Sequence, residues 1–221
     1  MLASLFAVVV LGLQTPPKPN YTFVFFKSGT NKEVLTKEQR EEAMTGHLGN
    51  LTRLWKEGIS PAAGPFGDNT ALRGIVVLKG DQGDAKQHFA NDPFVKMDKL
   101  VVDAHPWFLP DDPFAKVGED AEMKEYGVVL MYRGPKRGDP ATEAAQRLAS
   151  GHMSHLTALA KDGKVAAAGP FLDDGDLRGI VFFHTADERA ALEALAKDPA
   201  VEAGWLRIEY HPLWMAKGIL K

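Results

Sequence analysis

Residues 45–78 read TGHLGNLTRLWKEGISPAAGPFGDNTALRGIVVL, and residues 150–183 read SGHMSHLTALAKDGKVAAAGPFLDDGDLRGIVFF. The two stretches align without a gap at an offset of 105, and 18 of the 34 positions are identical. Self-similarity of this kind indicates one structural unit present twice. Further along, one insertion raises the offset to 106, so that Asp92-Pro93 aligns with Asp198-Pro199.

The repeat sets the expected domain boundaries. Repeat 1 is expected to cover residues 21–110, and repeat 2 residues 126–217. The stretch 111–125 between them is rich in charge and contains a proline, which is typical of a linker.

Each copy is expected to contain four strands. Three of them are apolar runs rich in β-branched and aromatic residues, and the second is a short strand through Ala-Ala-Gly, followed in copy one by a turn through Gly67-Asp68-Asn69. The expected strands of copy one are 21–27, 62–64, 72–78 and 100–105, and those of copy two are 126–133, 166–169, 177–183 and 205–211.

Two helices are expected in each copy. Thr36 and Gln39 form a capping-box pattern for the first helix of copy one, and Asp139 is the expected cap in copy two. The second helix of copy two is expected to open at Thr185. Each second helix is expected to end at Asp-Pro, since the residue before proline avoids the helical region. Apolar residues at helical spacing predict one buried face on the first helix: Met44, Leu48, Leu51, Leu54 and Trp55.

The resulting order, βαββαβ, is that of the ferredoxin-like split βαβ unit, so the fold class is α+β. Two helices would cover one face of each antiparallel sheet and leave the other face apolar. We therefore expect the two copies to pack sheet to sheet as a pseudo-dimeric α/β barrel within one chain, with further dimerisation open.

Composition excludes several classes of function. Lys and Arg number 26 against 29 Asp and Glu, a formal net charge of −3, so nucleic acid is not an expected partner. The chain has no cysteine, which excludes disulfides, thiolate catalysis and cysteine-based metal sites. His152 and His155 share one helical face, as metal ligands can, but copy one has Asn50 in place of His155. We expect no metal and no bound cofactor.

The first 20 residues form a separate segment. Residues 2–13 read LASLFAVVVLGL, an uncharged apolar run. A membrane-spanning helix needs about 20 residues, so we expect no spanning segment, and the run suits the core of a secretory signal peptide. A signal peptide would send the protein to the periplasm or outside the cell. Because no Lys or Arg precedes the run, an anchor or a misassigned start is the alternative, with a cytoplasmic protein if there is no signal peptide.

An ordered set of short motifs recurs in both copies: a strand, a helix with His-x-x-x-Leu, then Ala-Gly-Pro, then Asp-Pro before the last strand. This set resembles the YciI-like (YCII-related) family over nearly all of residues 21–215. The resemblance implies a dimeric α/β barrel, a pocket at the repeat interface and a His–Asp acid–base pair. Few members of that family have an assigned reaction, and one type eliminates chloride from a chlorinated hydroxyquinol.

The candidate catalytic residues are His47 with Asp92 and His152 with Asp198. Imidazole titrates near neutrality, and a carboxylate on its far nitrogen would fix the tautomer. The alternative is a buried histidine bonded to a backbone carbonyl, with the aspartate serving as a turn residue before proline.

Six further residues are candidate substrate contacts. Arg73 and Arg178 could clamp a carboxylate or phenolate, or instead pair on the surface with Asp68 or Asp173. Phe66 and Phe171 could line a pocket or instead pack in the core, and His105 and His211, each before a proline, could contact a ligand or instead end the last strand.

Two functions follow from these residues. One is a cofactor-independent lyase, dehydrochlorinase or isomerase that acts on a small, anionic or aromatic molecule. The other is a non-catalytic ligand-binding or scaffold protein that keeps the same fold.

Overall fold

The computed structural model describes residues 18–81 and 83–221. Most of the segment interpreted as a signal peptide lies outside these residues. Among those described, no helix is long and apolar enough to cross a membrane. Unit 1 comprises β1 (Tyr21–Ser28), α1 (Lys37–Lys56), β2 (Ala62–Pro65), β3 (Leu72–Lys79), the 3-10 helix η1 (Ala85–Phe89), α2 (Pro93–Lys96) and β4 (Leu100–Trp107). Unit 2 comprises β5 (Met123–Arg133), α3 (Glu143–Lys161), β6 (Val165–Pro170), β7 (Leu177–Phe183), α4 (Glu188–Ala196), α5 (Pro199–Glu202) and β8 (Leu206–Ala216).

Each unit forms one four-stranded antiparallel sheet. The strand orders are β2-β3-β1-β4 and β6-β7-β5-β8, so the two units have the same topology. The first strand of each unit pairs with both the third and the last strand. The predicted α+β class, with four strands in each copy, is confirmed. Strand β5 begins at Met123, within the stretch expected to be a linker.

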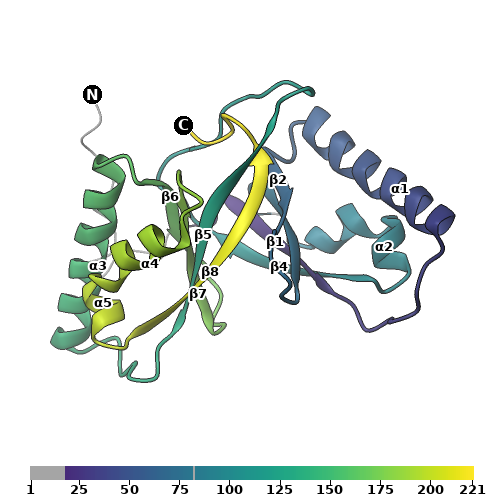
Figure 1. Cartoon of the computed structure of the whole chain (residues 1–221). Coiled ribbons are helices and arrows are strands. Elements are labelled where there is room, and N and C mark those ends of the chain that lie inside the picture. The colour runs from purple at the N-terminus through teal and green to yellow at the C-terminus, as the bar shows by residue number, and fades with distance from the viewer. Residues whose placement is uncertain (1–17, 82) are drawn as a thin grey trace.

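Helices lie on the two outer sides of the molecule and the strands lie between them (Figure 1). The inner faces of the two sheets share one buried cluster, which includes Phe23 and Phe25 of β1, Val128 of β5 and Phe182 of β7. The ring centroid of Phe23 lies 6.3 Å from that of Phe182. Because both sheets bury their inner apolar faces in this cluster, neither face is left to water.

The helix starts were predicted in part. Thr36 and Gln39 form the expected capping box of α1. In unit 2 the caps are instead Thr142 for α3 and Asp187 for α4, so the predictions of Asp139 and Thr185 were wrong. Thr142 and Asp187 each accept a hydrogen bond from the amide three positions later. Asp139 and Thr185 also have a side-chain oxygen near the helix start, so the sequence pattern did not decide between the candidates.

The predicted apolar face of α1 is only partly buried. Leu54 is fully buried, but Met44 and Leu48 are exposed. In the N-terminal half of α1 the inward side is instead formed by the buried Ala43 and the partly buried His47, so Met44 and Leu48 are left at the surface.

The Asp-Pro dipeptides begin helices rather than end them. Asp92 and Asp198 have extended backbones and are the N-caps of α2 and α5, with proline at the first helical position. Proline is favoured there because its missing N–H has no partner in a first turn anyway. The helix that precedes Asp92 is reduced to the 3-10 helix η1 in unit 1, whereas unit 2 has the full helix α4.

Candidate functional site

Each unit holds one of the expected His–Asp pairs between its long helix and its short one. Nδ1 of His47 on α1 lies 2.6 Å from Oδ2 of Asp92, and Nδ1 of His152 on α3 lies 2.6 Å from Oδ2 of Asp198. Both aspartates are buried, while the two imidazoles keep part of their surface exposed. The structure thus brings together both pairs of residues that the repeat singled out.

Each aspartate is fixed by its role as an N-cap. Oδ1 of Asp92 accepts a hydrogen bond from the amide of Phe94, and Oδ1 of Asp198 accepts from the amide of Ala200. The second oxygen is then aimed at the histidine. Burial raises the pKa of Asp198, but the hydrogen bond and charge of His152 outweigh burial and lower it below its usual range.

The arrangement determines which imidazole nitrogen is available. An ionised carboxylate only accepts, so Nδ1 of His47 and of His152 carries the donated proton. Nε2 of a neutral imidazole then has a free lone pair. Among the described residues, Nε2 of either histidine has no hydrogen-bond partner. Such a pair can take up and return a proton.

A glycine precedes each histidine and lies against the proline of the same pair. A Cβ added to Gly46 would lie 2.6 Å from Cγ of Pro93, and one added to Gly151 would lie 3.0 Å from Cγ of Pro199. Gly-His and Asp-Pro are therefore complementary parts of one helix–helix contact. This contact gives both dipeptides a packing role beside any chemical one.

Two more His–Asp pairs join the units, and the sequence did not predict them. Nδ1 of His105 on β4 lies 2.6 Å from Oδ2 of Asp173 in unit 2, and Nδ1 of His211 on β8 lies 2.6 Å from Oδ2 of Asp68 in unit 1. The alignment already contained the signal, because Asp68 aligns with Asp173 and His105 aligns with His211. The sequence alone predicts the two aspartates as partners for arginine, and the structure pairs them with histidine instead.

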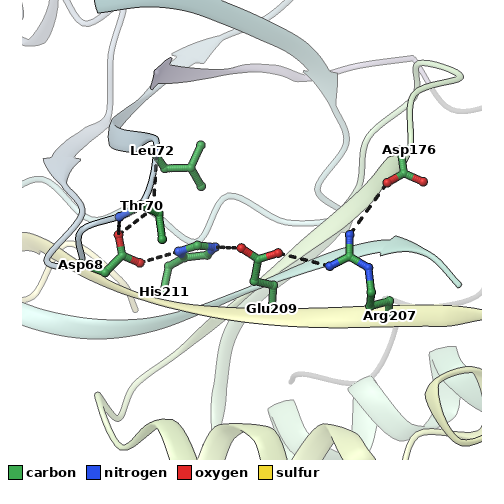
Figure 2. Close-up of polar contacts among 7 residues, drawn as sticks. All are labelled: Asp68, Thr70, Leu72, Asp176, Arg207, Glu209 and His211. Carbon is green, nitrogen blue, oxygen red and sulfur yellow. Dashed lines mark hydrogen bonds and ion pairs between the residues drawn. The ribbon is translucent and has the colours of Figure 1, made fainter. Parts of the chain in front are cut away.

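A second carboxylate flanks each of these histidines. Nε2 of His211 lies 3.2 Å from Glu209, whose other oxygen pairs with Arg207, and the whole row is visible in Figure 2. Nε2 of His105 likewise lies 3.2 Å from Asp103. Neither Nε2 is aligned for a hydrogen bond. The His105–Asp173 and His211–Asp68 pairs are reciprocal, because each unit supplies one histidine and one aspartate, as in an isologous interface.

The His–Asp contacts between the units shift the pKa values of His105 and Asp68. Burial lowers the pKa of His105, but the carboxylates of Asp103 and Asp173 outweigh it and raise that pKa above its ordinary value. Burial raises the pKa of Asp68, but hydrogen bonds from His211 and Thr70 outweigh it and lower that pKa. Both shifts favour an imidazolium beside a carboxylate at the junction.

The expected arginine sites are not assembled into a clamp. Arg73 donates to the hydroxyl of Ser28, and Arg178 donates to the backbone carbonyls of Asp173 and Gly175. The predicted alternative, a side-chain pair with Asp68 or Asp173, is therefore wrong, since both carboxylates bond histidines instead.

The remaining predicted contacts lie in the junction between the units. Phe66 packs against His211 with ring centroids 5.4 Å apart, and Phe171 packs against His105 at 5.2 Å. Both phenyl rings are buried. Their positions fit the alternative of core packing.

His155 is tied to the neighbouring helix. Its Nε2 lies 2.8 Å from the carbonyl oxygen of Ala194, and Asn50 donates to the equivalent carbonyl of His88 in unit 1. A histidine and an asparagine thus make the same contact in the two copies. Within the described part of the chain, no group of three or more histidines and acidic residues is placed to hold a metal ion.

Two surface cavities are found outside the His–Asp pairs. One, of about 430 Å³, lies between α1, β2 and residues 117–119, and the other, of about 450 Å³, lies between β7 and α4. The first includes Trp55 in its wall and the second His184. Neither is lined by His47 or His152.

Comparison with known proteins places a YCII-related domain at residues 126–210, which lie within unit 2. A search of curated proteins gave no significant match. Solved structures with a similar fold include a heme-binding protein from Thermus thermophilus, at 13% identity and a TM-score of 0.57, with 90% of this chain and 92% of that chain covered. A mutant chlorite dismutase from Candidatus Nitrospira defluvii has 13% identity and a TM-score of 0.55, with 89% and 92% covered.

These findings define a class: an α+β protein with two ferredoxin-like sheets, as in the chlorite dismutase structures, and with one YCII-related domain. At these identities the solved structures share the fold alone.

Proposed function

We propose that the chain is a cofactor-independent enzyme in which a His–Asp pair moves a proton on a small molecule. In this proposal unit 1 is a second, diverged YCII-like copy, and the two units form a pseudo-dimeric α/β barrel. The reaction is an elimination or an isomerisation, and the substrate is an anionic or aromatic molecule with an acidic proton.

One observation carries the proposal: in each unit a buried aspartate lies 2.6 Å from Nδ1 of a histidine whose ring is partly exposed. Nε2 of His152 accepts the substrate proton, and Asp198 stabilises the imidazolium that forms. Because the pKa of Asp198 is lowered, this carboxylate stays ionised near neutral pH. The imidazolium then returns the proton to the product or to a leaving group.

A heme does not fit this chain in the space between the sheets. That space is filled by a continuous cluster of side chains, with the rings of Phe23, Trp107 and Phe182 in contact. The heme named for one structural neighbour is a property of that protein, and at 13% identity it is not carried over to this chain.

The second candidate is a non-catalytic ligand-binding or scaffold protein. The close fit of Gly46 against Pro93, and of Gly151 against Pro199, favours it, because the same residues explain the His–Asp contacts as packing. In that case loss of the histidine would cost stability without changing any ligand response.

A screen of small carboxylic acids and phenols tests the two candidates. Compounds that raise the Tm of the wild type are incubated with the wild type, His47→Gln, His152→Gln and the double variant, and products are followed by chromatography. General acid–base catalysis contributes about 10²–10⁴ in rate, so the double variant should lose at least about 100-fold in turnover. His184→Gln is the matched control, since among the described residues no hydrogen bond or ion pair joins His184 to either pair. Equal turnover by the double variant would refute the enzyme.

A further inference from the structure

The cavity beside α1 is bounded by three segments that are far apart in the sequence. One wall comes from α1 and β2 of unit 1 and includes Leu51 and Trp55. The opposite wall comes from residues 117–119 and from Ala216 and Ile219 near the C-terminus. Its volume of about 430 Å³ lies within the range of about 300–1,000 Å³ that is usual for small-molecule sites. The space can therefore hold a small organic molecule that touches both units.

The wall opposite α1 is held in place by backbone hydrogen bonds. The amide of Ala115 donates to the carbonyl of Ile219 at 2.8 Å, and the amide of Lys221 donates to the carbonyl of Pro113 at 3.0 Å. Ile219 is buried in the cluster shared by the two sheets, and Val117 packs against that cluster. Because this wall is fixed by the fold itself, binding a ligand does not require the chain to become ordered.

The chemistry of the lining favours one class of ligand. Among the described residues that line the cavity, Glu119 has the only charged side chain and Trp55 the only aromatic ring. The others are aliphatic residues, proline, glycine and the hydroxyl residues Thr52 and Ser60. An ammonium group is attracted both by a carboxylate and by the face of an indole ring, whereas a carboxylate ligand would be repelled by Glu119. The lining therefore favours a cation with an apolar body.

Glu119 is already paired with an ammonium group of the protein. Nζ of Lys56 lies 2.5 Å from Oε1 of Glu119, and the two side chains are 57% and 58% exposed. An ion pair this exposed contributes little to stability, so a ligand can take the place of Lys56 at small cost. The carboxylate is thus placed to receive an ammonium group at the rim of the cavity.

Unit 2 does not repeat this lining. At the offset of 105, Trp55 aligns with Ala160, and Ser60 aligns with Val165. Glu119 lies in the stretch between β4 and β5, which joins the units and belongs to neither copy of the repeat. The ring, the hydroxyl and the carboxylate are therefore features of unit 1 and of the connecting stretch, and the proposed His–Asp chemistry uses none of them.

We propose that this cavity binds a small organic ammonium ion, with the ammonium group on Glu119 and the apolar body against Trp55 and Ile219. The indole of Trp55 supplies apolar contact and attracts the cation through its ring face. Because the ligand contacts both units and the stretch that joins them, its binding stabilises the folded chain. The site is separate from the His–Asp pairs, and the inference does not depend on the proposed function.

Three probes with the same six-carbon chain test the charge preference: hexylammonium, 1-hexanol and hexanoate. Each is titrated into the full chain at pH 7, and the indole N–H signal of Trp55, assigned with Trp55→Phe, is followed by NMR while Tm is measured in parallel. We expect hexylammonium to shift that signal, to raise the Tm, and to bind at least about five times more tightly than either other probe. Equal binding by hexanoate or 1-hexanol, or no shift of the Trp55 signal with hexylammonium, would overturn the proposal.

Two substitutions locate the bound cation. Glu119→Gln should weaken hexylammonium at least about fivefold and leave 1-hexanol unchanged, while Asp120→Asn, which removes a neighbouring carboxylate outside the lining, is the matched control. Both positions are exposed, so neither change threatens the fold. Trp55→Leu keeps an apolar side chain and should weaken hexylammonium more than 1-hexanol, because it removes the ring face. Equal losses in Glu119→Gln and Asp120→Asn would reveal a general surface attraction and refute the site, as would unchanged binding in Trp55→Leu.

Discussion

Replacing Asp68 by asparagine should weaken the junction between the two units. The carboxylate of Asp68 accepts from Nδ1 of His211 at 2.6 Å, and the imidazole it holds is 1% exposed. A hydrogen bond to a charged group contributes about 1.5–3 kcal/mol. Because the Asp68 side chain is 21% exposed, water screens part of the contact, and we expect the lower end, about 1.5 kcal/mol.

A double-mutant cycle isolates that contribution. The free energy of unfolding is measured in urea at pH 7 for the wild type, Asp68→Asn, His211→Gln and the double variant. The two single changes should fail to add by about 1.5 kcal/mol, because each removes the same contact. A cycle on His184 and Asp68, which do not touch, is the matched control and should be additive.

The coupling should also depend on pH in a defined direction. The pKa of Asp68 is lowered in the folded protein, so its stabilising effect is present above the ordinary value of 3.8 and is lost as the pH falls through the folded-state pKa. The cycle repeated in acid should therefore give a smaller coupling than at pH 7. A coupling below about 0.3 kcal/mol at pH 7, within ordinary additivity error, would refute this account of the junction.

Three further predictions concern other contacts. The pKa of His105 is raised, so its stabilising effect is complete below the ordinary value of 6.5 and is lost as the pH rises through the folded-state pKa; Tm should fall across that range in the wild type and fall less in His105→Gln. Gly46→Ala should lower the free energy of unfolding in urea, because its Cβ would meet Pro93, whereas Gly49→Ala, with nothing within 4 Å, should raise it by about 0.5–1 kcal/mol; equal effects would contradict the packing described for this face. Thr36→Ala should cost about 0.5–2 kcal/mol by the same assay, since it removes the α1 cap, and Thr36→Ser should restore most of that loss.

The sequence was most informative where one residue type has one structural use. The capping box at Thr36 was predicted because it needs two suitable side chains at once, Thr36 and Gln39. The His47–Asp92 pairing was predicted because the same two residue types recur at matching positions in the second half of the chain. The Asp-Pro dipeptides were misread, because proline both ends one helix and begins the next, and only the tertiary structure decides between these roles.

Contacts between the units were beyond local patterns. Asp68 and His211 are 143 positions apart, and no motif near either residue indicates the other as its partner. The apolar face of α1 was predicted wrongly in the N-terminal half of the helix, because Met44 and Leu48 have helical spacing but the neighbouring Ala43 is the residue that is buried there. Periodicity indicates which residues can face a core, but the neighbouring element decides how far that core reaches.

The reciprocal His–Asp contacts have a consequence for how each unit tolerates substitution. Each half supplies one acid and one imidazole, and each of these is used by the other half. A substitution of Asp68, in the β2–β3 turn of unit 1, therefore alters a contact of the last strand of unit 2. A substitution of Asp173, in the β6–β7 turn, alters a contact of the last strand of unit 1 in the same way. Residues around His47 and His152 differ between the units, as Phe94 and Ala200 show, whereas a change at the junction in one unit removes a contact of the other.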